Sequence, residues 1–342
     1  MSHPVKPYDM YKVVSAAICY LFFACALHAQ LPQEKGLQSI NRASAEAIVR
    51  FLADDELQGR EAGTHGARIA ARYLASCLKE AGIAPLDSTY YQPFEACSKE
   101  HRQWGAWEVH HDSIARLKQS VHRSLHMSNV LGIIPGQRSD EYVIVGAHFD
   151  HLGTDSTLAD DDIYNGADDN ASGVSAVLQI ARAFQTSGQK PLRTVVFAFW
   201  DGEEKGLLGS RYFVQTCPFI SQVKGYLNFD MIGRNNKPEQ PQHVVYFYTA
   251  GHPAFGDWLK QDVARHGLKL QPDYRAWDNP VGGSDNASFA LQGIPVIWYH
   301  TDGHPDYHRP SDHADRLNWE KVVEITKAAF LNAWNLANEN NY

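Results

Sequence analysis

From residue 129 onward, short apolar runs alternate along the chain with segments of mixed polarity. The apolar runs cover residues 130–134, 142–147, 195–200, 226–229, 244–248 and 295–299. Apolar residues recur at helical spacing in the segments near 172–187, 205–215, 254–266, 284–291 and 319–337. Strands that are apolar throughout and separated by helices are typical of a mostly parallel sheet covered on both faces. The pattern therefore predicts an α/β fold of three layers, a sandwich in which a mixed, mostly parallel central sheet lies between helices.

The chain before residue 129 is less regular. Residues 43–57 and 63–82 have the apolar spacing of helices. Residues 86–126 are polar and contain five histidines, which are His101, His110, His111, His122 and His126. These histidines lack a consistent ligand spacing, so we interpret residues 86–126 as a solvated surface insert rather than a metal site. With no internal repeat and no linker, residues 30–342 are expected to form a single domain.

The first 29 residues have the order of a secretory signal peptide. Lys6 and Lys12 precede an apolar run over residues 13–26, and small residues that suit cleavage follow. The run holds about 14 residues, fewer than the ~20 that a membrane-spanning helix needs. We therefore expect residues 1–29 to be removed and the mature protein to be exported, to a periplasm or outside the cell. Lipid attachment at Cys25 is the weaker alternative, because the residues before it match a lipid-attachment signal poorly.

Charge and cysteine content narrow the classes of partner. The chain carries 31 basic and 39 acidic residues; without residues 1–29, which hold two Lys and one Asp, 29 and 38 remain, a formal charge of −9. No basic stripe is present, so nucleic acid is not expected as a partner. No membrane span is expected either, because the apolar run near the N-terminus is too short. Cys77, Cys97 and Cys217 follow the signal region, and an odd number permits at most one internal disulfide with one free thiol. Nothing in the sequence points to a particular oligomeric state.

Histidine or carboxylate side chains follow four of the predicted strands. They are His148 and Asp150 after 142–147, Asp201, Glu203 and Glu204 after 195–200, Asp230 after 226–229, and His304 and His308 after 295–299. In open α/β sheets, ligands bind in the crevice at the carboxyl ends of the strands. Four strands thus bring side chains of metal-binding types to one edge of the sheet, and solubility alone would not require this.

A fifth polar group opens the predicted helix at 172–187. Asp168, Asp169 and Asn170 stand in a row there. One or two such residues would suffice to cap a helix N-terminus, so we expect one to cap and another to point into the crevice. Histidine and carboxylate ligands together suit zinc better than calcium, which takes oxygen ligands.

The number of these side chains indicates two metal ions. Two histidines and three carboxylates fill two zinc sites if one aspartate bridges them, which leaves room for a shared water. Ions about 3.5–4 Å apart would make hydroxide at neutral pH and stabilise the oxyanion as it forms. A neighbouring free carboxylate would take the proton, and the adjacent Glu203 and Glu204 suit this because only one of them need bind metal. Asp150 is placed to accept the second N–H of His148, with an ordinary strand-end aspartate as the alternative.

Five segments carry a resemblance to a known family. They are GAHFDHLG at 146–153, GADDNASG at 166–173, DGEEKGLLGS at 201–210, NFDMIG at 228–233 and DYHRPSD at 306–312. In this order they resemble the co-catalytic dizinc aminopeptidase family, zinc exopeptidases related to bacterial leucyl aminopeptidases, which also contains the glutamate carboxypeptidases. The resemblance covers roughly residues 40–340 and implies a zinc-peptidase, phosphorylase/hydrolase-like fold. The family's frequent protease-associated domain is not expected, because residues 86–126 are too short for it.

The resemblance implies a zinc-dependent exopeptidase with two Zn²⁺ per chain and a peptide as substrate, and the predicted signal peptide would make it a secreted one. The metal ligands that it implies are His148 and Asp230 for one zinc, Glu204 and His308 for the other, and Asp169 as the bridge. The zinc-bridged hydroxide would attack the scissile carbonyl, with Glu203 as the general base that passes the proton to the leaving amine. Asp150 would orient the ring of the first ligand, and His300 and His304 are expected in the surrounding loop or pocket.

The chain departs from the family pattern in one segment. Residues 283–289 resemble a Ser-Asp-His segment, but Asn286 stands where histidine is usual. A tyrosine that steadies the oxyanion in some relatives corresponds to Val281 here. The metals alone, or the metals with Tyr307, would then serve in that role.

Three other functions compete with this interpretation. A glutaminyl cyclase resembles the fold but uses a single zinc, and it would not need Asp169 as a bridge beside His148. A glutamate-type carboxypeptidase would need a basic pocket, for which Arg234 and Arg309 are candidates. A non-catalytic relative would have lost ligands or the base, and none is missing here. Because an acidic crevice favours a cationic amine over a carboxylate, aminopeptidase activity is the function expected.

Overall fold

The computed structural model describes residues 31–99 and 106–342. The predicted signal peptide, with Cys25, and His101 lie outside the described residues. The described part is centred on a nine-stranded sheet with the order β1-β3-β7-β4-β8-β11-β9-β10, and β2 pairs with β3 off this path. The strands are β1 (Ala84–Pro85), β2 (Tyr91–Ser98), β3 (Arg123–Ile134), β4 (Arg138–His148), β7 (Arg193–Trp200), β8 (Val223–Phe229), β9 (His243–Thr249), β10 (Gln271–Trp277) and β11 (Val296–His300). A separate small sheet joins β5 (Gly153–Thr154) to β6 (Ile163–Tyr164).

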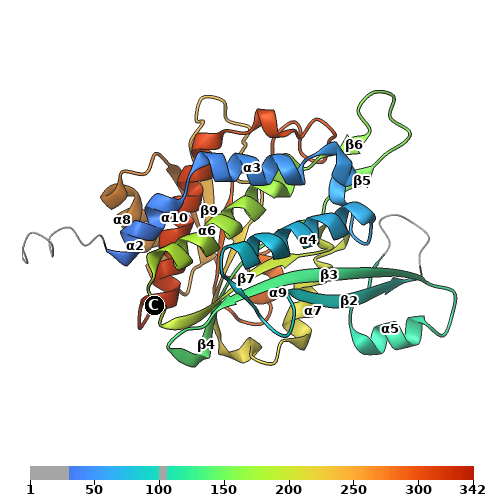
Figure 1. Cartoon of the computed structure of the whole chain (residues 1–342), viewed down its shortest axis with the longest axis horizontal. Coiled ribbons are helices and arrows are strands. Elements are labelled where there is room, and N and C mark those ends of the chain that lie inside the picture. Colours follow the sequence, from blue (N-terminus) through green and yellow to red (C-terminus); the bar gives the residue numbers. More distant parts are fainter. Residues whose placement is uncertain (1–30, 100–105) are drawn as a thin grey trace, which may run out of the picture.

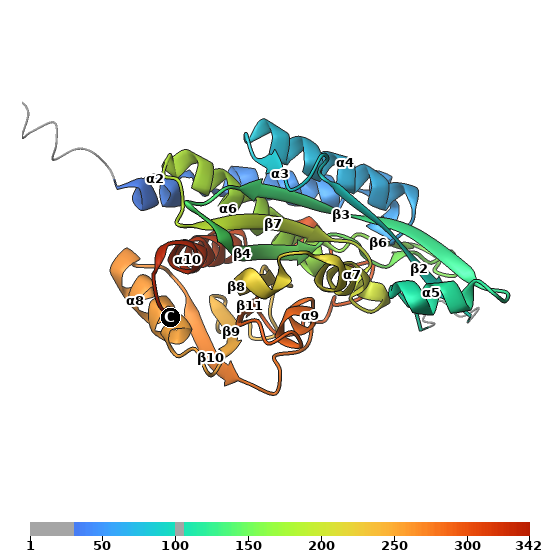
Figure 2. The ribbon, with the colours of Figure 1, turned by 90° about the horizontal axis from the view of Figure 1, so that it is seen from below.

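Helices cover both faces of the sheet (Figure 1). One face carries α2 (Pro32–Ser39), α3 (Arg42–Leu52), α4 (His65–Glu80), α6 (Gly173–Ser187), α8 (Ala254–His266) and α10 (Trp319–Asn338). The other face carries α7 (Leu208–Thr216) and α9 (Asn286–Ala290), and α5 (His111–Leu117) lies beside β2. Figure 2 shows the sheet between α3, α4 and α6 on one side and α7 and α9 on the other. The predicted three-layer α/β fold is confirmed.

The central strands run parallel. β4 pairs in parallel with β7 and with β8, and β8 pairs in parallel with β11. Antiparallel pairs join β3 to β7 and β9 to β11, so the sheet is mixed, as predicted. Because β4, β7, β8 and β11 point the same way, their carboxyl ends meet at one edge of the sheet.

Side chains of the central strands alternate between two cores. Val143 and Val145 of β4 lie in the larger core, with apolar residues of α6 and α10. Ile144 lies in the smaller core, which α7 and α9 cover. All residues of β7 are buried. Both faces of these strands are therefore covered, which explains why they are apolar without interruption.

The segment 86–126 differs in part from our expectation of a surface insert. β2 pairs along its length with β3, and Phe94, Ala96 and Trp107 belong to a third buried cluster. Pro93 and Glu95 interrupt the apolar pattern of β2, and a strand at a sheet edge tolerates proline. Of the histidines described in this segment, none belongs to a group with metal-ligand spacing.

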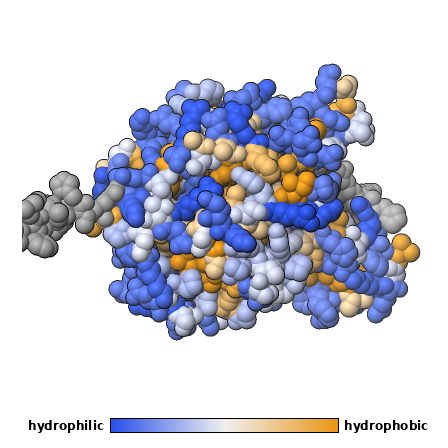
Figure 3. Space-filling model, in the orientation of Figure 1, coloured by the Kyte–Doolittle hydropathy of each residue, from blue (hydrophilic) through white to orange (hydrophobic). Residues whose placement is uncertain are grey.

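The three cysteines after the signal region are buried free thiols. Among the described helices, none combines the length and the apolar character that crossing a bilayer requires. Figure 3 shows a mainly hydrophilic face in which apolar residues appear as separate areas.

Candidate metal centre

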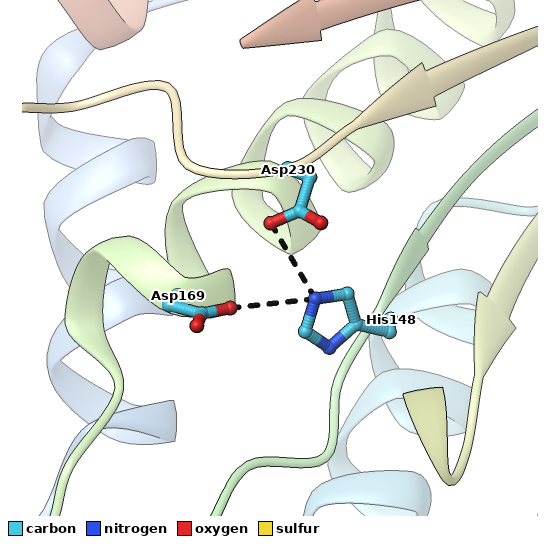
Figure 4. Close-up of side chains that lie close together, drawn as sticks. All are labelled: His148, Asp169 and Asp230. Atoms are coloured by element: carbon cyan, nitrogen blue, oxygen red, sulfur yellow. Dashed lines mark ion pairs between the residues drawn. The ribbon is translucent and has the colours of Figure 1, made fainter. Parts of the chain in front are cut away.

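The carboxyl ends of the central strands bring three buried side chains together (Figure 4). His148 is the last residue of β4, Asp230 directly follows β8, and Asp169 lies in the turn before α6. Nε2 of His148 is 3.4 Å from Oδ1 of Asp169 and 3.5 Å from Oδ1 of Asp230. Ligand atoms on a tetrahedral zinc ion, with bonds of about 2.0–2.1 Å, are about 3.3 Å apart. Both distances are close to this spacing, and the ligand atoms of the three residues all lie within 4.8 Å of one another, so they could hold one ion. We call His148 and Asp230 the first half of the centre.

The other oxygen of Asp169 faces a different histidine. Nε2 of His308 is 3.1 Å from Oδ2 of Asp169 and 3.2 Å from Oε2 of Glu204. Glu204 belongs to the short helical turn η3 (Glu203–Lys205) after β7, and His308 to the loop after β11. We call Glu204 and His308 the second half of the centre. The structure thus brings all five predicted ligands together, with one oxygen of Asp169 toward each half.

Asp150 ties the first half to the turn that carries the second. Its Oδ1 accepts the backbone N–H of Glu203 at 3.0 Å, and its Oδ2 accepts that of Glu204 at 3.3 Å. Nδ1 of His148 lies 3.3 Å from the backbone oxygen of Asp150 and 3.7 Å from its Oδ1. Asp150 therefore lies beside His148, and its carboxylate also fixes the turn of Glu203 and Glu204.

Glu203 faces a cavity of about 210 Å³ beside the metal-binding side chains. The cavity is lined by Asp169, Glu203, Asp230, Met231, Gly283, Trp298, His300, Gly303, Tyr307 and His308. Burial, and then the charges of Glu204, Asp230 and Asp285, hold the pKa of Glu203 well above its ordinary value against the opposing effect of His148. A carboxylate with a raised pKa in a cleft is suited to taking up a proton near neutral pH.

The charges of the site fit the binding of cations. Burial alone would lower the pKa of His308, but the hydrogen bonds and charges of Asp169 and Glu204 raise it to about 10. Burial of His148 is likewise outweighed by the surrounding carboxylates, and its pKa is raised. Nε2 of His148 is buried and has no hydrogen-bond partner in the described structure. A buried imidazole nitrogen left open among carboxylates suits a metal ion, and the mixed ligand set suits zinc.

Comparison with known proteins identifies the family. The sequence profile of peptidase family M28 matches residues 129–332, more than half of the chain. The chain belongs to peptidase family M28. The resemblance found in the sequence is thereby confirmed, and the protein is a member of a family of zinc-dependent peptidases.

Two curated relatives of this M28 peptidase match it over about half of its length. Leupeptin-inactivating enzyme 1 of Streptomyces exfoliatus is 33% identical over 170 residues, which cover 49% of this chain and 34% of that protein. A probable glutamate carboxypeptidase of Arthroderma benhamiae is 40% identical over 212 residues, which cover 56% of this chain and 26% of that protein. The match thus spans about a third of the length of the first relative and about a quarter of the length of the second.

Solved structures share the fold of this M28 peptidase. The LapA aminopeptidase of Legionella pneumophila has a TM-score of 0.65 at 24% identity, over 89% of this chain and 73% of that one. BSAP, a zinc aminopeptidase from Bacillus subtilis, has a TM-score of 0.67 at 14% identity, over 89% and 97%. A glutaminyl cyclase of Fimbriiglobus ruber has a TM-score of 0.65 at 17% identity, over 87% and 95%. The fold is therefore common to aminopeptidases and a cyclase, and the side chains of the site must distinguish them.

Other side chains predicted at the strand ends have separate partners. Nε2 of the buried His304 is 3.3 Å from Oδ2 of Asp168. Nδ1 of His300 is 2.6 Å from the backbone oxygen of Asp230, and His300 also lines the cavity. Oδ2 of Asp201 accepts a backbone N–H from β3 at 3.1 Å. These contacts agree with the expectation that His300 and His304 belong to the surroundings of the centre.

Asn286, the departure from the family pattern, is buried and holds the loop before it. Its Nδ2 donates to the backbone oxygens of Val281 at 2.7 Å and Gly282 at 3.2 Å. Val281 is buried in the smaller core. Tyr307, in contrast, lines the cavity and stacks on His308, with ring centroids 3.9 Å apart. Burial and the carboxylates of the centre raise the pKa of Tyr307, so its phenol remains an O–H donor.

His151 lies at the centre although the sequence analysis gave it no role. Its Nδ1 is 2.8 Å from Oε1 of Glu204 and 3.8 Å from Oδ2 of Asp169. These three residues form a second group with the geometry to hold a metal ion. The available signal was a second histidine in the segment 146–153, but a sequence does not tell which way a side chain points beyond the end of a strand.

Two further buried charges hold the loops that carry the ligands. Arg60 donates to the backbone oxygen of Phe149 at 2.8 Å and to that of Asn165 at 2.7 Å. Asp312 accepts the backbone N–H of Asp169 at 3.1 Å. Asp312 is the last residue of the fifth family segment, so the sequence resemblance could have indicated a role for it. No sequence feature indicated a role for Arg60, because arginine is mostly exposed in proteins and a single arginine in a sequence does not predict burial.

Proposed function

We propose that this M28 peptidase is a secreted aminopeptidase that works with two zinc ions. The observation that carries the proposal is the position of Asp169, whose two oxygens lie toward His148 on one side and His308 on the other. A single-zinc enzyme such as a glutaminyl cyclase has no need for this arrangement. His148 and Asp230 would hold one ion, Glu204 and His308 would hold the other, and Asp169 would bridge them.

The lining of the cavity favours the amino end of a peptide. Three carboxylates line it, and no Lys or Arg does so among the described residues. A carboxypeptidase needs a cation that binds the terminal carboxylate of its substrate. Of the two arginines considered for this role, Arg234 is paired with Asp306 at 2.7 Å, and Arg309 is exposed and does not line the cavity. An N-terminal amine therefore suits the cavity better than a C-terminal carboxylate.

Glu203 would move the proton in this reaction. Zinc, when bound, acts as a Lewis acid and lowers the pKa of water to about 7. Glu203 would accept a proton from the attacking water and deliver it to the nitrogen of the leaving amine. Asp150 accepts the backbone N–H of Glu203, which fixes the position from which its side chain extends. The O–H of Tyr307 would donate to the carbonyl oxygen as negative charge develops on it.

The proposal includes export and a single catalytic domain over residues 30–342. It is supported by the charged and apolar order of residues 1–29. The intact mass of the protein recovered from a secreting host tests this part. A mature chain that begins at Gln30 is expected, and a chain that keeps residues 1–29, or that carries lipid on Cys25, would contradict it.

Zinc content measured together with hydrolysis of Leu-p-nitroanilide tests the activity. We expect about two zinc ions per chain, release of nitroaniline, and loss of turnover on chelation that added zinc restores. N-acetylated Leu-p-nitroanilide should not be cleaved, because it lacks the charged amine that the acidic cavity would bind. Cleavage of an amine-blocked peptide from its C-terminus would favour a carboxypeptidase. One zinc per chain with cyclisation of an N-terminal Gln peptide would favour the cyclase.

A further inference from the structure

His151 lies against the second half of the centre, and the two-zinc assignment leaves it without a role. Its side chain is fully buried, with Nδ1 2.8 Å from Oε1 of Glu204. The other oxygen of Glu204, Oε2, is 3.2 Å from Nε2 of His308. One carboxylate thus has a histidine at each oxygen, and the two histidines need different explanations.

The fold holds the His151 ring in a fixed place. The backbone N–H of His151 donates to the backbone oxygen of Arg60 at 3.2 Å. The ring lies against Gly166, where an added Cβ would come within 2.5 Å of Cδ2 of the ring. Gly166 has a φ of +57°, a conformation that glycine adopts without strain. The ring also meets the ring of His308 edge-on, with centroids 5.9 Å apart.

Distances separate a metal ligand from a hydrogen-bond donor. The atom pairs expected to share an ion are 3.1 to 3.5 Å apart in this centre, close to the ~3.3 Å of a tetrahedral zinc site. Nδ1 of His151 is closer to Oε1 of Glu204, at the 2.8 Å of a hydrogen bond, and farther from Oδ2 of Asp169, at 3.8 Å. The second half with Asp169 already supplies three protein ligands, and a fourth would close the open position that a catalytic zinc keeps.

The nitrogen atoms of His151 also argue against a role in packing alone. Its Nε2 is buried without a hydrogen-bond partner in the described structure. A buried polar atom without a partner is unfavourable, and phenylalanine would fill similar space without one. A histidine rather than a phenylalanine at position 151 is therefore explained by the hydrogen bond between its Nδ1 and Glu204.

We propose that His151 is a positioning residue for the second zinc ion. Its Nδ1–H donates to Oε1 of Glu204 and so turns Oε2 of Glu204 toward His308 and the ion. The inference rests on the proposed two-zinc function. Hydrogen bonds to the ligands of a metal typically contribute about 10–100-fold in metal affinity, so the effect is large enough to measure.

Zinc binding to the metal-free protein, followed with a competing chromophoric chelator, tests the role of His151. His151→Phe keeps a ring and removes the donor, and it should weaken one of the two binding steps, that of the ion in the second half, about 10–100-fold while the other step is unchanged. His151→Asn puts an amide N–H where Nδ1 lies and should bind the second zinc about as tightly as the wild type. His151→Gln puts the amide where Nε2 lies and should be as weak as His151→Phe. The control is His111→Phe, at a side chain that is 94% exposed.

Cobalt in place of zinc distinguishes a positioning residue from a ligand, because its visible absorption depends on the number and type of ligands. Cobalt-saturated His151→Phe and His151→Asn should keep the wild-type band intensity. A loss of intensity in both would make His151 a direct ligand and overturn the positioning role. If both binding steps were unchanged in His151→Phe, or if the Asn and Gln variants were weakened equally, the positioning role would be overturned as well.

The test remains decisive if one variant does not fold. The Asn and Gln variants place the same amide at the two nitrogen positions, so their comparison decides without His151→Phe. A wild-type protein that binds a single zinc would refute the proposed two-zinc function itself. A wild type that binds two, with equal affinities in the Asn and Gln variants, would refute only the role of His151.

Discussion

The two halves of the metal centre are held by different parts of the fold. In the first half, His148 ends β4 and Asp230 follows β8, and these strands pair with each other in the middle of the sheet. In the second half, Glu204 lies in the turn η3, and His308 lies in a loop with a left-handed φ of 54°. The side chain of His148 is 1% exposed, whereas that of His308 is 32% exposed.

Paired strands therefore fix the first half, whereas side-chain contacts fix the second. The turn of Glu204 is held by Asp150, and the His308 loop by Asp306. Loops held by a few side chains open at lower free energy than central strands do. If two zinc ions are bound as proposed, we expect them to be bound with unequal strength, and the ion of the second half to be bound more weakly.

Glu203 belongs to neither half, and its removal should separate the chemistry from metal binding. Glu203→Gln keeps the size of the side chain but cannot take a proton, so turnover should fall by about 10²–10⁴-fold. Zinc content should stay at the wild-type level. Turnover of Leu-p-nitroanilide and zinc by mass spectrometry check both, with Glu80→Gln, at a side chain that is 75% exposed, as the control. Loss of a zinc ion from Glu203→Gln would instead make Glu203 a metal ligand.

Arg60 supports the loops around the first half and should have the next largest effect. It is fully buried, and Arg60→Met would leave several backbone oxygens without a donor, among them those of Phe149, Asn165 and Gly166. Each unsatisfied oxygen costs about 1–3 kcal/mol, and relaxation of the loops relieves part of this cost. We therefore expect the free energy of unfolding to fall by about 3–5 kcal/mol. Urea unfolding of the metal-free protein measures it.

A matched control separates stability from metal binding in this prediction. Arg193 is also buried and donates to the backbone oxygen of Leu336 at 2.9 Å, but it lies at the opposite end of β7 from the centre. Arg193→Met should destabilise the fold and leave zinc affinity unchanged, whereas Arg60→Met should weaken zinc binding as well. Wild-type stability in Arg60→Met would show that Arg60 does not hold these loops.

The sequence predicted the ligands of the first half, but it did not predict the residues that hold the surrounding loops and ligands in place. Uninterrupted apolar runs predicted β4 and β8, and the polar residues after them indicated that His148 and Asp230 would share one edge. β10 was missed because it is half-exposed and lacks such a run. Arg60 was missed because its partners are backbone oxygens, three of them 89 to 106 positions away, which no residue pattern records. His151 was missed because its direction depends on the turn after β4.

Removal of one histidine from each half tests the comparison directly. His308→Ala should lower the affinity for one zinc ion by more than the roughly 10–100-fold that a hydrogen-bonding partner of a ligand contributes. The other zinc ion should stay bound. His148→Ala should lose more zinc, because it removes a ligand of the tighter site among buried carboxylates. Zinc content after dialysis at fixed free zinc measures the difference, with His122→Ala as the control. Equal losses in the two variants would show that the halves do not differ in affinity.

Asp306 anchors the loop of the second half and should give the smallest effect. Its carboxylate accepts from Oγ of Ser311 at 2.6 Å, Nη2 of Arg234 at 2.7 Å and Nη1 of Arg316 at 3.0 Å. Burial alone would raise its pKa, but these hydrogen bonds and charges lower the pKa to about 2. Asp306→Asn should therefore lower the free energy of unfolding at neutral pH by about 1–2 kcal/mol.

The effect of Asp306→Asn should also depend on pH in one direction. An unfolded aspartate titrates near 3.9, and Asp306 in the folded protein at about 2, so its charge stabilises the fold fully above about pH 5 and loses that effect toward pH 2. Urea unfolding of metal-free wild type and variant should therefore show a gap that is constant from about pH 7 to 5 and shrinks toward pH 3. Asp315→Asn, at an exposed neighbour, should stay close to the wild type throughout. A gap that does not shrink would mean that the shape of this side chain, and not its charge, holds the loop of His308.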